Sequence, residues 1–128
     1  MNAEAAPVII LVADDDLDNL NIIKLKLTAH GLDVVTARDG EQALRMARES
    51  PPSLIILDVM MPKLSGFKAA RLIKFDARLS NIPLILLTAR TQDTDRSTGE
   101  EVGADLYLTK PFDPEVLLKE VQRLLGMS

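Results

Sequence analysis

Cysteine is absent from the 128-residue sequence, and histidine occurs only once. The absence of cysteine excludes disulfide bonds, thiolate catalysis and cysteine-based zinc sites, and it is compatible with a reducing compartment. We therefore expect a cytoplasmic protein. The single histidine, His30, has no metal-ligating partner near it in the sequence, so we expect it to be solvated at the end of a helix.

An excess of basic residues is also missing, because 15 Lys and Arg stand against 19 Asp and Glu, a formal net charge of -4. Proteins that bind phosphate backbones usually carry a basic surface, so direct binding to nucleic acid is not expected. The apolar run at residues 8–13 is too short for a signal or membrane-spanning core, and no basic residue precedes it. We expect no membrane contact.

The apolar residues that are present form uninterrupted runs at residues 8–13, 54–57 and 84–87. Strands that helices cover on both faces have such runs, whereas half-exposed strands alternate apolar and polar residues. These runs therefore predict central strands of a parallel sheet. Residues 33–37 and 105–109 are more polar, which predicts strands at the edges of the sheet.

Segments with helical spacing of apolar residues lie between the predicted strands. Leu20, Ile23 and Leu27 share one face of the first helix. Asp39 is placed to cap the second helix, and Asp113 is placed to cap the last one, where a proline follows it. The last helix should bury Leu117, Leu118, Val121, Leu124 and Leu125.

Two further helices complete the alternation of strands and helices. One is expected from about Ser65 to Phe75, and the other over residues 92–102, where an almost wholly polar sequence predicts the loosest element. Strict alternation predicts an α/β fold, a doubly wound five-stranded parallel sheet of order 2-1-3-4-5 with five helices. With 47% hydrophobic residues, the 128 positions suit one domain with residues 1–7 as a short tail.

Acidic residues follow two of the predicted central strands. In a sheet of this order the ligand crevice lies between the first and third strands, at their carboxyl ends. Asp14 and Asp15 end the first strand, and Asp58 ends the third. Carboxylates a few ångströms apart raise one another's pKa or require a cation, and hard oxygen ligands of this kind suit Mg²⁺. The sequence therefore predicts a Mg²⁺ site.

Thr88 ends the fourth predicted strand and Lys110 follows the fifth, so a hydroxyl and an ammonium group are available for an anion. Three carboxylates, Mg²⁺ and Lys110 have charges that sum to zero, which lets a phosphoryl group enter the site. These residue types predict phosphoryl transfer, with Asp58 as the nucleophile that forms an acyl phosphate.

At these residues the chain resembles the receiver domains of response regulators in two-component signalling. The resemblance covers nearly the whole chain and lies in separate motifs that occur in the family's order. These motifs are Leu11-Val12-Ala13-Asp14-Asp15, Leu57-Asp58-Val59-Met60-Met61-Pro62 with Gly66, Leu87-Thr88-Ala89, Gly103-Ala104-Asp105 and Lys110-Pro111-Phe112.

The resemblance implies a role for each residue of the site. Asp14 and Asp15 would help to hold Mg²⁺, and Asp58 would be both a ligand and the phosphoacceptor. The backbone carbonyl of Met60 would be a further ligand. Thr88 and Lys110 would contact the phosphoryl oxygens, and a cis peptide before Pro111 would direct Lys110 into the site.

The resemblance also implies partners and a signal. A histidine kinase or histidine phosphotransfer protein would supply the phosphoryl group, and a downstream effector would respond to it. Tyr107 would turn inward when Thr88 moves and so change the face of the fourth helix, fifth strand and fifth helix; as a residue, it could equally be a half-buried strand aromatic. Leu106 replaces an acid common in dimerising members, which favours a monomer or weak dimer.

Three other functions compete with this one. An aspartyl-phosphate hydrolase would need a second aspartate two residues after Asp58, where this chain has Met60. A flavodoxin-like cofactor binder would need a phosphate cradle where Asp14 and Asp15 stand. A receiver that only docks would not need the complete site. We therefore expect a signalling phosphoacceptor and not an enzyme, although it would take part in its own phosphorylation and dephosphorylation.

Overall fold

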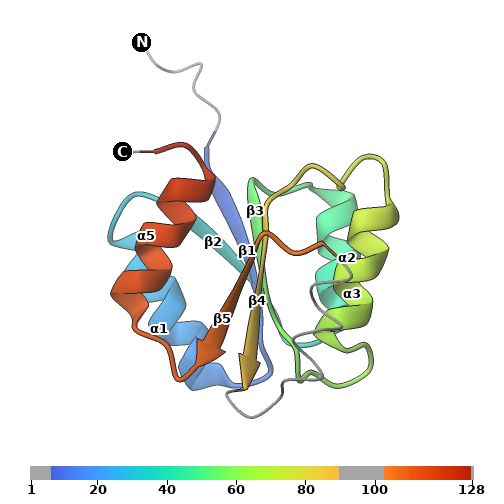
Figure 1. Cartoon of the computed structure of the whole chain (residues 1–128), viewed down its shortest axis with the longest axis horizontal. Helices are drawn as coiled ribbons and strands as arrows, with labels where there is room; N and C mark the ends of the chain where they lie inside the picture. Colours follow the sequence, from blue (N-terminus) through green and yellow to red (C-terminus); the bar gives the residue numbers. More distant parts are fainter. Residues whose placement is uncertain (1–6, 90–102, 128) are drawn as a thin grey trace.

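The computed structural model describes residues 7–89 and 103–127, which form a parallel five-stranded sheet between helices (Figure 1). The strand order is β2-β1-β3-β4-β5, as predicted. All four neighbouring pairs of strands are parallel. The strands are β1 (Ile9–Ala13), β2 (Asp33–Ala37), β3 (Leu54–Asp58), β4 (Leu84–Ala89) and β5 (Leu106–Lys110).

Helices lie on both sides of the sheet, with α1 and α5 on one face and α2 and α3 on the other (Figure 1). The helices are α1 (Leu17–Thr28), α2 (Gly40–Glu49), α3 (Gly66–Phe75) and α5 (Pro114–Leu124). The helix predicted over residues 92–102 falls outside the described residues. No helix in the described part of the chain is long and apolar enough to cross a membrane.

Each helix begins at a side chain that accepts hydrogen bonds from the amides of its first turn. The N-caps are Asp16, Asp39, Ser65 and Asp113, so the predicted caps at Asp39 and Asp113 are confirmed. Amides in the first turn of a helix lack acceptors within the helix, which is why such caps stabilise it. His30 is exposed just after α1, as expected.

Two apolar clusters sandwich the sheet, one beneath α2 and α3 and the other beneath α1 and α5. All five residues of β3 are buried, whereas every residue of β5 is only half-buried and β2 alternates between exposed and half-buried positions before Ala37. The prediction of central strands and edge strands is therefore confirmed.

Two details differ from the sequence-based expectation. In α5, Leu117, Leu118 and Val121 are buried, but Leu124 and Leu125 are only half-buried because the helix ends there, at the margin of the cluster. The fifth strand also ends one residue later than predicted, so Lys110 is its last residue and does not follow it.

Candidate metal and phosphoacceptor site

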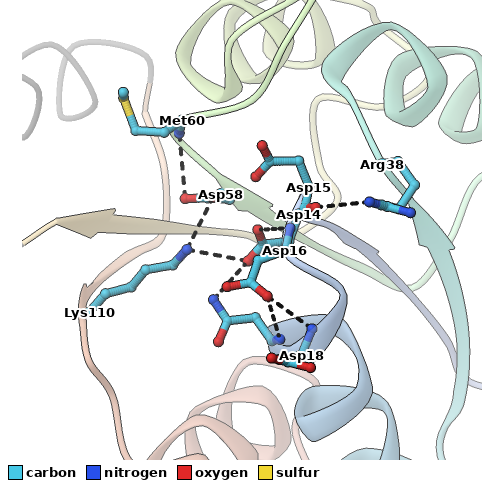
Figure 2. Close-up of polar contacts among 9 residues, drawn as sticks. Asp14, Asp15, Asp16, Asp18, Arg38, Asp58, Met60 and Lys110 are labelled. Carbon is cyan, nitrogen blue, oxygen red and sulfur yellow. Dashed lines mark hydrogen bonds and ion pairs between the residues drawn. The ribbon is translucent and has the colours of Figure 1, made fainter.

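Carboxylates from two neighbouring strands meet at the carboxyl edge of the sheet (Figure 2). Ala13 pairs with Leu57 in register, so the residues that follow them, Asp14 and Asp58, lie side by side. One carboxylate oxygen from each of Asp14, Asp15 and Asp58 lies within 4.8 Å of the others. The structure therefore brings together the three acidic residues that the sequence predicted to converge.

The three carboxylates differ in exposure. Asp14 is fully buried and Asp58 is 4% exposed, whereas Asp15 is exposed. Beside Asp15, a hollow of about 470 Å³ is lined by residues of the loop after β3, among them Met60 and Ser65. The site is thus closed on the side of the sheet and open toward this loop.

The buried carboxylate of Asp14 is surrounded by hydrogen-bond donors. Its Oδ1 accepts from the amide of Asp16 at 3.0 Å, and its Oδ2 accepts from Asn19 Nδ2 at 3.3 Å and from Lys110 Nζ at 3.3 Å. A buried charge is tolerated only when donors or opposite charges compensate it. These three donors explain how Asp14 remains in the interior.

Lys110 connects the two buried carboxylates. Its Nζ lies 3.1 Å from Asp58 Oδ2 and 3.3 Å from Asp14 Oδ2, and its side chain is 25% exposed. Burial opposes the charged ammonium, but Asp58 and Asp14 outweigh that effect and raise the pKa of Lys110. The Lys110–Pro111 peptide is cis, which confirms the predicted isomer.

Asp58 remains short of positive charge in spite of this ion pair. Burial, reinforced by the negative charge of Asp14, raises its pKa to about 7, and Lys110 offsets only part of the shift. A further cation beside Asp58 would stabilise the ionised form of its carboxylate. Because all three acidic side chains offer hard carboxylate oxygens, they form a donor set that fits Mg²⁺.

The loop after β3 carries Met60 past the site. The Met60 amide lies 3.4 Å from Asp58 Oδ1 and donates a weak hydrogen bond to it, and its side chain is 59% exposed. Gly66 begins α3 directly against this loop, where a Cβ would collide with the carbonyl oxygen of Asp58. The glycine of the motif therefore allows the close approach that positions the loop.

The remaining predicted residues lie on β4 and β5. Leu87 pairs with Asp58, so Thr88, the next residue, reaches the same edge of the sheet, and it is 2% exposed. Tyr107 is half-buried and packs against the cluster under α2 and α3. Thr88 thus lies at the same edge of the sheet as the carboxylates, while Tyr107 lies earlier on its strand, opposite Leu86.

Asn19 and Arg38 also contact the site, although the sequence did not single them out. Asn19 Nδ2 donates a hydrogen bond to Asp14 Oδ2. Arg38 Nη2 donates a 2.9 Å hydrogen bond to the carbonyl oxygen of Asp15. Asn19 lies in the first turn of the helix after Asp15, and Arg38 directly follows β2. Both positions adjoin the carboxyl edge, which is the signal that could have drawn attention to them.

The family model described as "Response regulator receiver domain" matches residues 10–122. This chain belongs to that family. The match includes Asp14, Asp15, Asp58, Thr88 and Lys110.

Curated relatives and solved structures agree with this assignment. The chain is 40% identical over 119 residues to the "Alkaline phosphatase synthesis transcriptional regulatory protein PhoP" of Bacillus subtilis, covering 93% of this chain and 49% of PhoP. It is 39% identical over 117 residues to "Protein PilH" of Pseudomonas aeruginosa, covering 91% of this chain and 97% of PilH. The chain thus spans about half the length of PhoP and nearly all of PilH.

A crystal structure with magnesium in its active site cleft is also similar. It is the receiver domain of the sensor histidine kinase PA1611 of Pseudomonas aeruginosa, with a TM-score of 0.87 and 33% identity. The alignment covers 94% of this chain and 99% of that one. The chain is therefore a receiver domain, a phosphoacceptor of two-component signalling, on a fold that binds Mg²⁺ in this family.

Proposed function

We propose that Asp58 is the residue of this receiver domain that accepts the phosphoryl group. The observation that supports this most is the position of its carboxylate, 3.1 Å from Lys110 Nζ and grouped with Asp14 and Asp15. A nucleophilic carboxylate needs positive charge beside it to balance the phosphoryl oxygens that approach it. Asp58 is the member of the group that Lys110 contacts most closely.

The reaction would form a bond between a carboxylate oxygen of Asp58 and phosphorus. With a phosphohistidine donor the P–N bond breaks, and the leaving imidazole nitrogen takes a proton, so a histidine kinase or a histidine phosphotransfer protein suits the role of donor. Lys110 would contact one oxygen of the transferred group, and the Thr88 hydroxyl would donate to another.

Asp14, Asp15, Asp58 and the backbone carbonyl of Met60 would hold Mg²⁺. The ion supplies positive charge that offsets the negative charge of the carboxylates and of the phosphoryl oxygens. Asp14 is held in place by Asn19 and by the Asp16 amide, so it is a preorganised ligand. Asp15 would complete the set from the exposed side.

The output would pass through β5 to a downstream effector. Thr88 and Tyr107 lie on adjacent strands, and once Thr88 contacts a phosphoryl oxygen the half-buried Tyr107 ring would turn further inward. The surface around β5, α5 and the expected fourth helix would then change for the partner. We expect this exchange to occur in the cytoplasm, with the domain acting as a monomer or weak dimer and without direct contact with nucleic acid.

A hydrolase of the aspartyl-phosphate type fits the site less well. Such an enzyme needs a second acid that donates and accepts protons, and Met60, two residues after Asp58, offers a thioether instead. A receiver that only docks is the remaining alternative, and it would need neither the buried charge of Asp58 nor its lysine partner. Both alternatives predict that Asp58 is not stably phosphorylated.

Intact-protein mass spectrometry tests the proposal directly. Incubation with acetyl phosphate and Mg²⁺ should add about 80 Da to the protein. The addition should disappear in Asp58→Ala and after chelation with EDTA. A matched control is Asp33→Ala, which removes an exposed carboxylate at the opposite end of β2. Phosphorylation of Asp58→Ala to the level of the unchanged protein would contradict the proposal.

A further inference from the structure

Arg38 contacts the acidic site from the residue that directly follows β2, a strand that supplies none of the carboxylates of the site. Its Nη2 donates a 2.9 Å hydrogen bond to the backbone carbonyl oxygen of Asp15, a contact between residues 23 positions apart in the sequence (Figure 2). The side chain is exposed, so burial of its own apolar atoms does not explain the arrangement. The contact instead joins the end of β2 to the start of the loop after β1.

The backbone around Arg38 is itself held in place. The Arg38 amide donates to Gln42 Oε1 at 2.8 Å, and Gln42 in turn lies in the first turn of α2. One residue earlier, the carbonyl of Ala37 accepts from the amide of Asp14 at 3.1 Å. The hydrogen bond from the Arg38 guanidinium to Asp15 therefore adds one further contact beyond the paired ends of β1 and β2. The backbone of Arg38 is anchored to α2 through Gln42.

Asp15 is the carboxylate for which such a contact matters most. Asp14 is held by three donors, and Asp58 is held by Lys110 and by the Met60 amide. Among the described residues, the carboxylate of Asp15 makes no hydrogen bond or ion pair. Its position is thus determined by the backbone from which it projects, and Arg38 holds the carbonyl of that same residue.

We infer that Arg38 is a positioning residue for the Mg²⁺ site, acting through the Asp15 backbone and not by touching the ion. The inference rests on the proposed site and adds a residue that the receiver motifs do not include. Groups that orient metal ligands from outside the first shell commonly change affinity by an order of magnitude when removed. Loss of Arg38 should therefore weaken Mg²⁺ binding.

The direction of the change in Mg²⁺ affinity shows whether Arg38 acts by positioning Asp15 or by its charge. Arg38 is a cation near a cation site, so by Coulomb's law alone its removal would reduce repulsion and tighten Mg²⁺ binding. If Arg38 instead orders Asp15, its removal lets this ligand move and weakens binding in spite of the lost repulsion. The two explanations thus predict changes of opposite direction.

The experiment is a calorimetric titration of the chelator-treated full chain with MgCl₂. We expect Arg38→Gln to raise the Kd for Mg²⁺ by about fivefold to tenfold. Arg38→Lys, which retains the charge and one hydrogen-bond donor, should restore part of the affinity. Arg45→Gln is the matched control, because Arg45 is an exposed arginine of α2 whose side chain makes no hydrogen bond or ion pair with Asp15. The Kd of this variant should be unchanged or slightly lower.

Hydrogen exchange gives a second readout that does not involve Mg²⁺. In EDTA, the amides of Asp16 and Asp18 should exchange faster in Arg38→Gln than in the unchanged protein, whereas amides of β4 should be unaffected. A Kd for Arg38→Gln that is equal to or lower than that of the unchanged protein would overturn the inference while leaving the site intact. If the unchanged protein bound no Mg²⁺, the proposed site and the inference would both be overturned.

Discussion

The middle of the sheet and its carboxyl edge are buried to a similar degree, but they contain opposite kinds of side chain. Val12 and Ile56 are paired in register and have no exposed surface. Two residues further along the same strands, Asp14 and Asp58 are 0% and 4% exposed. Burial of an apolar side chain stabilises the fold, whereas burial of a carboxylate costs free energy unless a partner compensates it.

This comparison teaches where the domain gains stability and where it gives stability up. The apolar middle of the sheet holds the strands together, and the charged edge depends on that support. The mutual repulsion of Asp14 and Asp58 favours binding of a cation, and a bound cation would in turn offset the negative charge of a phosphoryl group. Substitutions that change one region at a time test this contrast.

The largest effect is expected in the middle of the sheet. Ile56→Ala should lower the free energy of unfolding by about 4 kcal/mol, because it leaves a cavity in the cluster under α1 and α5. Urea denaturation followed by circular dichroism measures the loss, and Ile56→Val, which removes one methylene, should cost only about 1 kcal/mol. A loss below about 1 kcal/mol for the alanine variant would show that neighbouring side chains fill the cavity and that packing around Ile56 contributes less to stability than we expect.

At the carboxyl edge, a substitution that abolishes function should stabilise the fold. The folded-state pKa of Asp58 is raised to about 7 from an ordinary value of 3.8. Between these two pKa values the folded protein holds a proton on Asp58 that the unfolded chain releases. The stability that this proton contributes is fully present below the unfolded pKa of 3.8 and is lost as the pH rises through the folded pKa of about 7. At pH 8 in EDTA, Asp58→Asn should gain about 2 kcal/mol.

The pH dependence of this gain is its control. At about pH 3 and below, Asp58 is protonated in the folded and largely in the unfolded protein, so Asp58→Asn and the unchanged protein should be nearly equal in stability. Urea denaturation at both pH values makes the comparison. A variant that was less stable than the unchanged protein at pH 8 would mean that the Lys110 ion pair outweighs the cost of burial.

Binding of Mg²⁺ should offset the repulsion between the carboxylates, so that the carboxyl edge, like the apolar middle of the sheet, stabilises the fold. At ten times its Kd, the ion should raise the free energy of unfolding by about 1.4 kcal/mol. Metal ligands must be deprotonated, so the stabilisation at a fixed Mg²⁺ concentration should be larger at pH 8 than at pH 6. Thermal unfolding with Mg²⁺ and with EDTA measures it, and equal shifts at the two pH values would argue against Asp58 as a ligand.

The smallest effect concerns a single donor to the buried Asp14. Asn19→Ala removes the 3.3 Å hydrogen bond to Asp14 Oδ2 and should cost about 0.5 kcal/mol. Asn21→Ala, at an exposed position of the same helix, is the control and should have no measurable effect. If the two variants proved equally stable in urea, then Lys110 and the Asp16 amide would be sufficient to hold Asp14.

Much of this arrangement could be predicted from the sequence, because short-range rules determine it. Apolar runs indicated the central strands, and the caps at Asp39 and Asp113 lie where the sequence placed them. The convergence of Asp14 and Asp58 followed from topology, since parallel strands place their carboxyl ends at one edge. Such inferences need only the order of the strands and the residues that end them.

The other properties of the site depend on three-dimensional detail. Asp14 and Asp15 are neighbours in the sequence, yet one is buried and the other exposed, because the turn after β1 directs them to different sides. The distances from Lys110 to both carboxylates depend on the path of β5, which no local sequence pattern describes. The role of Arg38 could not be predicted, because its contact with Asp15 joins residues 23 positions apart and no local sequence pattern indicates it.

The contact of Lys110 with both Asp14 and Asp58 has a consequence for how the domain tolerates changes in its surroundings. The lysine is a counterion attached to the chain, so it offsets part of the charge of both carboxylates whether or not Mg²⁺ is present. An Mg²⁺ ion held by Asp14 and Asp58 would compete with this ammonium group for their oxygens. That competition would limit the affinity for Mg²⁺ and keep the occupancy of the site responsive to Mg²⁺ concentration, which suits a signalling domain that has to be reset many times.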